Sequence, residues 1–492
     1  MKLFNKISVA FVICFIILSF ENSLIGQNIT KNIESDSILN FNFPGMKIGV
    51  AENEDGPTGT TVFYFPNRVM GAADVRGGAT GTVNASAVSR GYEDKMIDAV
   101  VFSGGSWYGL SAATGVADEI KNIKAKEGKV DYIAGVLGGI IYDVGGRRFS
   151  RVTPDHELAR EAINNAKNNE FPLGAKGAGR FAMQGVYFYG KTDGSVDGYA
   201  GWPHSGQGAA FGEIGETKIA VFTVVNALGT IVDRNGHVIR CNRNFLGEDC
   251  PTASEMIRNI SALKQLDSTR VTGPTNNTTL TLVVTNQKLP FWALQRLATQ
   301  VHTSMGRAIQ PFSTQYDGDV LYAVSTNEVE NPKLSPINLA VAASELAWDA
   351  VLNSVPELPN KPILIESKLG MKAYKKLKGE YEFYGGGVLQ IDEDELGLWA
   401  KFMGDGKIYF DENRIYRIQP TENGLFVVDA PAQDIIQFED NIVTINPGPW
   451  AIKAIRKNYE NTHNTVYEII APIRSLRFIY WTLCSIYKNR TY

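Results

Sequence analysis

The feature that most constrains this chain is an abrupt change from polar to apolar residues near its middle. The polar, turn-forming run Thr275–Thr279 leads directly into Leu280–Thr285, where β-branched and apolar residues predict a buried strand. Thr278 is therefore expected where a loop meets a sheet, so its hydroxyl can be exposed and yet rigidly held. The same residues also suit an ordinary turn, or glycosylation sequons at Asn276 and Asn277.

Strand and helix patterns alternate over residues 45–355. Ala99–Ser103 is a compact apolar run and Lys218–Val225 alternates less strictly, as strands covered on both faces do. Apolar residues recur at helical spacing after Pro290 and again after Pro336, which stands at a first helical position. These elements predict an α/β domain.

A different pattern begins after a Pro-rich linker at residues 356–369. Short alternating runs, such as residues 396–402 and 407–410, are separated by turn residues. We expect a small antiparallel β domain over residues 370–457. Residues 458–492 are expected to be a poorly ordered tail, with an interfacial helix as the alternative.

The first 26 residues have the pattern of a secretory signal peptide. Two lysines precede the apolar run Ile7–Phe20, which is too short for a comfortable membrane span. We expect a secreted or periplasmic protein whose membrane contact is limited to this segment or the tail; a retained anchor is the alternative. In an exported chain, Cys241 and Cys250 could form a local disulfide or remain free thiols.

Charge and composition exclude several function classes. The formal net charge is -4 and basic residues are dispersed, so the sequence indicates no basic patch that would bind nucleic acid. Cysteines and histidines lack zinc-site spacing, and the five histidines follow no Ser/His/Asp order. We therefore expect no metal or organic cofactor.

Many separated blocks of this chain resemble the β-peptidyl aminopeptidase family, also called DmpA-like, including its threonine-nucleophile nylon-oligomer hydrolases. The resemblance covers about residues 45 to 355. The blocks, in the family's order, are Met46–Val50, Thr58–Val62, Ala73–Thr82, Ala99–Ser106, Tyr108–Leu110, Ile140–Asp143, Val225–Ala227, Asn277–Thr279 and Asp317–Asp319. It implies a four-layer α-β-β-α sandwich and an assembly of several αβ units; family members usually end before the predicted β domain.

The resemblance makes Thr278 the nucleophile. An N-terminal threonine carries its own base in its free α-amine, which titrates near neutral pH. For that amine to be free, the bond between Asn277 and Thr278 must be cut, and we expect the Thr278 hydroxyl to attack the Asn277 carbonyl.

The remaining site residues also follow from the resemblance. Asn226 is expected to form the oxyanion hole, although a strand-end turn residue is the alternative. Asp317 and Asp319 are expected to orient and polarise the nucleophile, whereas the residues alone also suit a plain β-turn.

Three assignments stay open. The resemblance implies a lysine whose positive charge offsets the two carboxylates. Lys191 is the best match to that lysine and Lys176 is the competing candidate. The alternative is that the matched residue is only a solvated loop lysine. Tyr142 is either a substrate-pocket or proton-positioning residue, or a core tyrosine. The loop Gly104–Ser106 could bind an anion through its backbone, although tight packing turns explain it more economically.

Together these expectations describe an exported, self-processing aminopeptidase or amidase that acts on peptides or small amides. The alternative from another class is a noncatalytic exported binding protein that keeps the fold and holds a partner with its β domain. A serine amidase using Ser103 or Ser106 is weaker, because neither serine lies in a nucleophile-elbow pattern.

Overall fold

The computed structural model describes most of the predicted domains. The described ranges are 38–54, 56–90, 94–144, 152–185, 204–240, 252–255, 258, 277–356, 376–383, 387–404, 414–421, 424–428 and 435–457. The predicted signal peptide, nearly all of the linker, Lys191, both cysteines of the predicted disulfide and the tail lie outside these ranges.

A single long strand, β3 (Thr58–Val75), joins the two arms of a ten-stranded sheet. Its first half pairs with β2 and β5, and its second half pairs with β14. The strand order is β4-β6-β5-β3-β14-β12-β10-β9; β2 also pairs with β3, and β7 pairs with β2. The other bounds are β2 Lys47–Asn53, β4 Thr82–Val83, β5 Ile97–Ser103, β6 Val136–Ile140, β7 Lys167–Asn168, β9 Gln207–Ile214, β10 Thr217–Asn226, β12 Thr278–Gln287 and β14 Val320–Val329.

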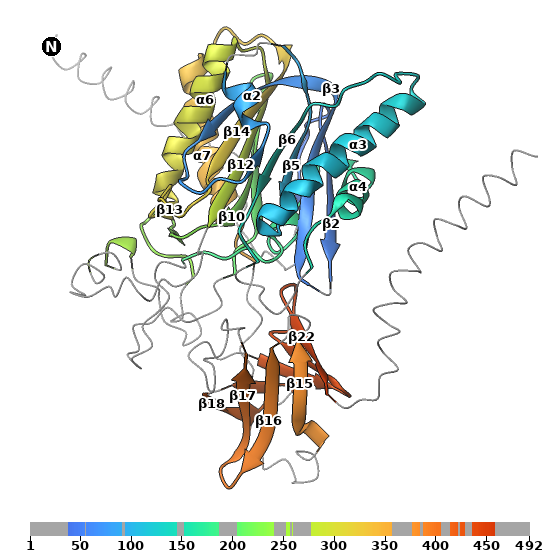
Figure 1. Ribbon diagram of the computed structural model, residues 1–492. Helices are drawn as coiled ribbons and strands as arrows, with labels where there is room; N and C mark the ends of the chain where they lie inside the picture. The colour runs from blue at the N-terminus through green and yellow to red at the C-terminus, as the bar shows by residue number, and fades with distance from the viewer. Residues whose placement is uncertain are drawn as a thin grey trace, which may run out of the picture.

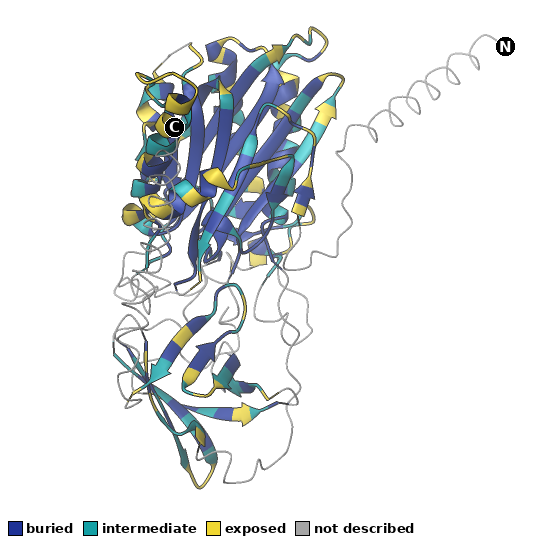
Figure 2. Cartoon of the chain, turned by 90° about the vertical axis from the view of Figure 1, so that its right-hand side faces the viewer, coloured by how far each residue is buried: buried dark blue, intermediate teal, exposed yellow. Residues whose placement is uncertain are grey.

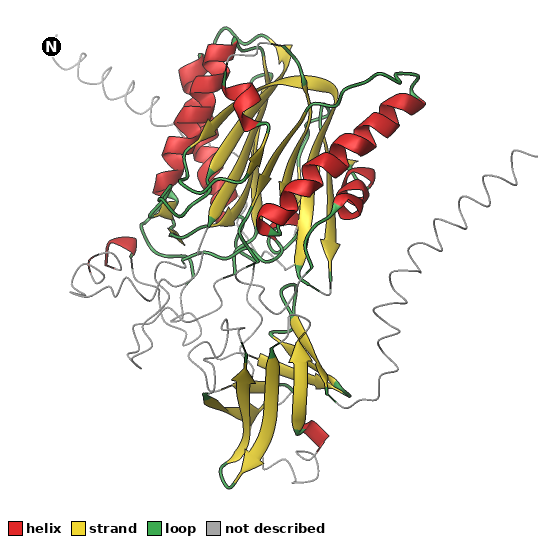
Figure 3. Ribbon diagram, in the orientation of Figure 1, coloured by secondary structure: helices red, strands yellow, loops and turns green. Residues whose placement is uncertain are grey.

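Helices cover both outer faces of the two arms (Figures 1 and 3). The bounds are α2 Ala85–Ser89, η2 Ser106–Leu110, α3 Ser111–Lys126, α4 His156–Asn164, η3 Gly177–Gly179, α6 Phe291–Ser304, η6 Met305–Arg307 and α7 Pro336–Leu352. Two small ladders complete the domain: β1 (Ile38–Asn40) with β8 (Glu170–Pro172), and β11 (Thr230–Ile231) with β13 (Ile309–Gln310).

Three hydrophobic cores define four layers. One core lies between the two arms, one packs the first arm against α3 and α4, and one packs the second arm against α6 and α7. Within β12, Leu282 belongs to the core between the arms and Val283 to the core under the helices, because successive side chains point to opposite faces. The strands are accordingly buried on both faces (Figure 2), and the four-layer α-β-β-α sandwich is confirmed.

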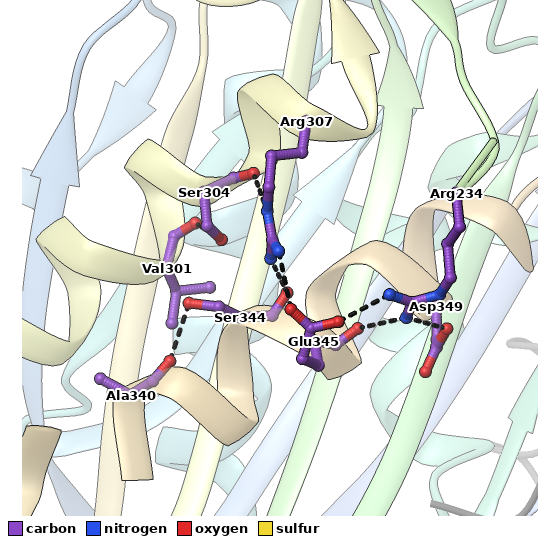
Figure 4. Close-up of polar contacts among 8 residues, drawn as sticks. All are labelled: Arg234, Val301, Ser304, Arg307, Ala340, Ser344, Glu345 and Asp349. Carbon is purple, nitrogen blue, oxygen red and sulfur yellow. Dashed lines mark hydrogen bonds and ion pairs between the residues drawn. The ribbon is translucent and has the colours of Figure 1, made fainter. Parts of the chain in front are cut away.

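The predicted helix starts are confirmed as well. Helix α6 begins directly after Pro290, and α7 has Pro336 in its first turn with Ser335 as a cap that accepts from the Asn338 N–H. Arg307 and Arg234 both pair with Glu345 on α7, at 2.7 and 2.6 Å (Figure 4). These pairs tie neighbouring loops to α7, but their exposure limits their contribution to stability.

The C-terminal strands form a closed antiparallel barrel, which confirms the predicted β domain and adds its closure. The strands are β15 Gly379–Phe383, β16 Val388–Asp394, β17 Gly397–Met403, β18 Ile415–Pro420, β19 Phe426–Val428, β20 Ile435–Glu439, β21 Ile442–Ile445 and β22 Ile452–Arg456. Trp450 is buried in the barrel core, which also includes Ala175 and Phe181 of the sandwich. In the described part of the chain, no helix is long and apolar enough to cross a membrane.

Candidate active site

Thr278 begins β12 and is fully buried in this uncleaved chain. It has the same parity along the strand as Leu280 and Leu282, so its side chain points to the space between the two arms. The Thr278 Oγ1 donates a hydrogen bond of 2.5 Å to the carbonyl oxygen of Asn277. The hydroxyl therefore lies beside the peptide group that it is expected to attack.

Asn277 is held by the turn that precedes β14. Its N–H donates to the Tyr316 carbonyl at 2.8 Å, and its carbonyl oxygen accepts from the Gly318 N–H at 2.6 Å. A hydrogen bond to a carbonyl oxygen polarises the group and stabilises negative charge that develops there. The Gly318 amide is thus placed to assist attack on the Asn277 carbonyl.

Gly318 is a site residue that sequence reasoning missed, because the prediction treated it only as a spacer between two aspartates. A Cβ at this position would lie 2.6 Å from the Thr278 Oγ1 and 2.8 Å from the Ala79 carbonyl oxygen. Gly77 packs just as closely against the same turn, since its Cβ would lie 2.2 Å from the Asp317 carbonyl oxygen. The glycines let three backbone segments meet at the nucleophile.

The acidic pair accepts hydrogen bonds from the backbone of Thr279 and from two loops beside it. The Asp319 carboxylate accepts from the Thr279 N–H at 2.6 Å and from the Ser313 N–H at 3.0 Å. The Asp317 carboxylate accepts from the Leu228 N–H at 3.2 Å and from the amide and hydroxyl of Thr314 at 2.9 and 2.7 Å. These contacts orient the nucleophile through its backbone neighbours.

Burial changes the protonation of this pair. Desolvation raises the pKa of the Asp319 carboxyl well above its usual range, and the nearby Asp317 raises it further. Desolvation also raises the pKa of Asp317, although hydrogen bonds from Thr314 and Leu228 oppose it. A proton held on the pair removes negative charge near Thr278. If the Thr278 amine is freed as the sequence predicts, less positive charge from a lysine is then needed to balance the pair.

Asn226 ends β10 and is the direct cross-strand partner of Thr278. Side chains of such partners share a face and lie about 4.5–5.5 Å apart at Cβ. The Asn226 Oδ1 accepts from the Met183 N–H at 3.0 Å, and its Nδ2 donates to the Tyr142 carbonyl at 3.3 Å. Because the N–H can only donate and the carbonyl can only accept, the orientation of the amide is unambiguous. Met183 is a second contact that sequence reasoning missed.

Tyr142 is brought to the site through its backbone carbonyl, and its side chain is half-buried. The Tyr142 ring lies 6.2 Å from the ring of Trp107, which is 64% exposed. The side-chain role of Tyr142 stays a prediction.

The structure describes only one of the two candidate lysines. Lys191 lies outside the described residues, so its assignment stays a prediction. Lys176 is half-buried and directly precedes η3, in the segment that leads to Met183. It also remains a candidate.

Other residues singled out from the sequence have structural roles here. The Gly105 N–H donates to the Asp143 carboxylate at 2.7 Å, so the protein's own carboxylate occupies the loop considered for an anion. Ser103 shares a hydrogen bond of 3.1 Å with Thr60 in the interior, and the Ser106 Oγ accepts from the Val144 N–H. Among the five histidines, for which the sequence showed no Ser/His/Asp order, His302 is buried against Asp74, with 2.9 Å between its Nδ1 and the carboxylate.

Comparison with known proteins agrees with this geometry. The family model of peptidase family S58 matches residues 42–358. A 6-aminohexanoate-oligomer endohydrolase of Paenarthrobacter ureafaciens is 36% identical over 332 residues, which cover 64% of this chain and 86% of that protein. A protein of Mycobacterium leprae named as an uncharacterized aminopeptidase is 28% identical over 260 residues, with coverages of 50% and 65%.

A solved structure of a Burkholderia sp. beta-aminopeptidase aligns with a TM-score of 0.44 and 13% identity, covering 73% of this chain and 93% of that one. The family match spans the sandwich, including all four described residues at its centre: Thr278, Asn226, Asp317 and Asp319. This chain belongs to peptidase family S58 and is a hydrolase of peptide or amide bonds.

Proposed function

We propose that this chain is an exported, self-processing aminopeptidase or amidase whose nucleophile is Thr278. The observation that carries the proposal is the position of the Thr278 hydroxyl, 2.5 Å from the Asn277 carbonyl oxygen, which also accepts from Gly318. Hydroxyl, polarising donor and scissile peptide group are thus in contact before any cleavage.

Maturation would proceed through an ester. The Thr278 Oγ1 forms a bond to the Asn277 carbonyl carbon, the bond from that carbon to the Thr278 nitrogen breaks, and the nitrogen gains a proton. Water then hydrolyses the ester, which leaves a carboxylate on Asn277 and a free amine on Thr278. The neutral amine can accept the proton of its own hydroxyl.

Turnover would repeat the same chemistry on a substrate amide. The Thr278 Oγ1 attacks the substrate carbonyl, the amine product leaves, and water hydrolyses the acyl-enzyme. Asn226 is oriented so that its Nδ2 can donate to the oxyanion, a contribution typically worth about 10²- to 10³-fold in rate.

The test compares the wild-type chain with Thr278→Ala on a panel of aminoacyl p-nitroanilides. We expect the wild-type protein to run as two fragments on a denaturing gel and to release p-nitroaniline, whereas the variant stays one chain and is inactive. Hydrolysis by Thr278→Ala at the wild-type rate would contradict the proposal. A folded, two-fragment protein that hydrolyses no member of the panel would favour the binding-protein alternative.

An endo-acting amidase is the second candidate function. Relatives named as 6-aminohexanoate-oligomer endohydrolases are 34–36% identical to this chain, whereas those named as aminopeptidases are 28–30% identical. Linear 6-aminohexanoate oligomers therefore belong on the panel. Release of monomers from one end would support the aminopeptidase, and internal cleavage would support the second candidate.

Export and assembly are also proposals. The pattern of residues 1–26 supports export, and the family resemblance supports an oligomer of αβ units. Cell fractionation and light scattering of the purified protein test them separately.

A further inference from the structure

An aromatic stack is among the contacts between the C-terminal barrel and the sandwich. The Trp450 ring lies over the His204 ring with 4.5 Å between centroids and 12° between planes, and Phe181 meets the same imidazole edge-on at 4.9 Å. Trp450 and His204 are both buried. Figures 1 and 2 show the barrel beyond one end of the sandwich.

A polar contact reinforces this stack. The Arg180 Nε donates to the Pro449 carbonyl at 2.9 Å, while the rest of its guanidinium pairs with Glu52 and Glu54 of the sandwich. Burial, together with the positive charge of Arg240, lowers the pKa of His204 to about 3. The imidazole is therefore neutral across the physiological range, and the stack does not depend on its protonation.

The stacked residues belong to the segments that support Asn226. His204 bridges Met183 in antiparallel fashion, and the Ser205 N–H donates to the Ala182 carbonyl at 3.0 Å. The Ser205 Oγ donates in turn to the Val225 carbonyl at 2.5 Å. Met183 packs against the barrel core with its side chain and binds the Asn226 Oδ1 with its N–H.

We propose that the barrel positions the oxyanion-hole amide, with Trp450 as the positioning residue that acts through His204 and Met183 on Asn226. The inference rests on the proposed catalytic role of Asn226. It assigns a purpose to a domain outside the region matched by the family, residues 42–358.

The first measurement is steady-state kinetics on an amide that the wild-type chain hydrolyses. Trp450→Leu keeps an apolar side chain in the barrel but removes the stacking ring, so we expect kcat to fall about 10- to 10²-fold while KM changes little. Trp450→Phe restores a ring and should recover most of kcat. Leu398→Ala is the control, because it truncates a buried side chain of the same barrel core, beside the β16–β17 hairpin, but leaves the ring stacked on His204, and it should leave kcat unchanged.

A double-mutant cycle with Asn226→Ala decides whether Trp450 acts through Asn226. If it does, Trp450→Leu causes no further loss of kcat in the Asn226→Ala background. Equal losses in both backgrounds, an effect on KM alone, or an equal loss from Leu398→Ala would overturn the proposal.

Hydrogen exchange tests the contact between the barrel and the segment of Met183 without measuring catalysis. The inference can therefore fail even if the proposed function is correct. We expect Trp450→Leu to speed amide exchange in a peptide covering residues 180–184 while β12 stays protected. Leu398→Ala should leave that peptide unchanged. Unaltered exchange at residues 180–184 in Trp450→Leu would overturn the proposal whatever the enzyme's activity.

Discussion

The two halves of the candidate site are held by different parts of the chain. In the nucleophile half, Asn277 is bound by the backbone of Tyr316 and Gly318, and Asp319 binds Thr279, the residue after Thr278. These binding residues lead into the strand that pairs with β12. The oxyanion half, Asn226, is bound by Met183, whose segment packs on the barrel. The contacts that hold Asn277 and Thr278 lie within the sandwich, whereas the contacts that hold Asn226 extend to Trp450 in the barrel. Residues expected to act in the same reaction can therefore be held in place by different parts of the chain.

The largest effect is expected from Gly318→Ala, which disturbs the nucleophile half alone. The added Cβ would lie 2.6 Å from the Thr278 Oγ1, so hydroxyl and turn cannot both keep their places. We expect cleavage at Asn277 to slow by on the order of 10²-fold or more, measured as precursor remaining on a denaturing gel. Gly306→Ala is the control, because its Cβ would meet no atom within 4 Å. Normal maturation of Gly318→Ala would contradict the role given to this turn.

Asn226→Ala disturbs the oxyanion half and is expected to lower kcat by about 10²- to 10³-fold. Asn286→Ala is a matched control, since Asn286 accepts from the Lys218 N–H at 2.7 Å and donates to the Glu216 carbonyl at 3.0 Å, away from the site. Both variants leave a backbone N–H without its partner, at a cost of about 1–3 kcal/mol in unfolding free energy. Similar kcat losses in the two would show that Asn226 is only structural.

Asp319→Asn tests the nucleophile half through the pH dependence of stability. The measurement uses the Thr278→Ala background, in which the chain is expected to stay uncleaved. Because burial raises the pKa of Asp319, the folded chain keeps a proton that the unfolded chain releases near the ordinary carboxyl value. Its contribution to stability is thus complete at low pH and is lost as pH rises through the raised pKa. This decline in unfolding free energy is at most about 1.4 kcal/mol per pH unit, and we expect Asp319→Asn to remove it. Urea unfolding at several pH values measures the slope. An unchanged pH slope would mean that Asp319 is ionised in the fold.

The smallest effect is expected where neither half of the site is involved. Glu345→Gln weakens exposed pairs with Arg234 and Arg307 on α7 (Figure 4). We expect the unfolding free energy to fall by no more than about 1 kcal/mol, with kcat unchanged. A loss of activity would show that the outer helix layer is coupled to the site.

The sequence predicted those features that depend on local pattern. The strand after Thr278, the proline starts of α6 and α7 and the antiparallel character of the C-terminal domain are all confirmed. The pairing of Asn226 with Thr278 depends on strand register, which no spacing reveals; the resemblance pointed to Asn226 but not to this pairing. Met183 acts through a backbone N–H group that almost every residue has, so its type carries little signal. Gly318 has to be glycine because other backbone segments approach it closely, and that approach is seen only in the folded chain. The stack of Trp450 on His204 joins two domains and has no local signature.

The central claim is that the nitrogen of Thr278 becomes a free amine. Intact mass measurement of the purified wild-type protein, with N-terminal sequencing of its fragments, tests it most directly. We expect one fragment to begin at Thr278 and the other to end at Asn277. An active preparation in which residues 277 and 278 are still joined would contradict it.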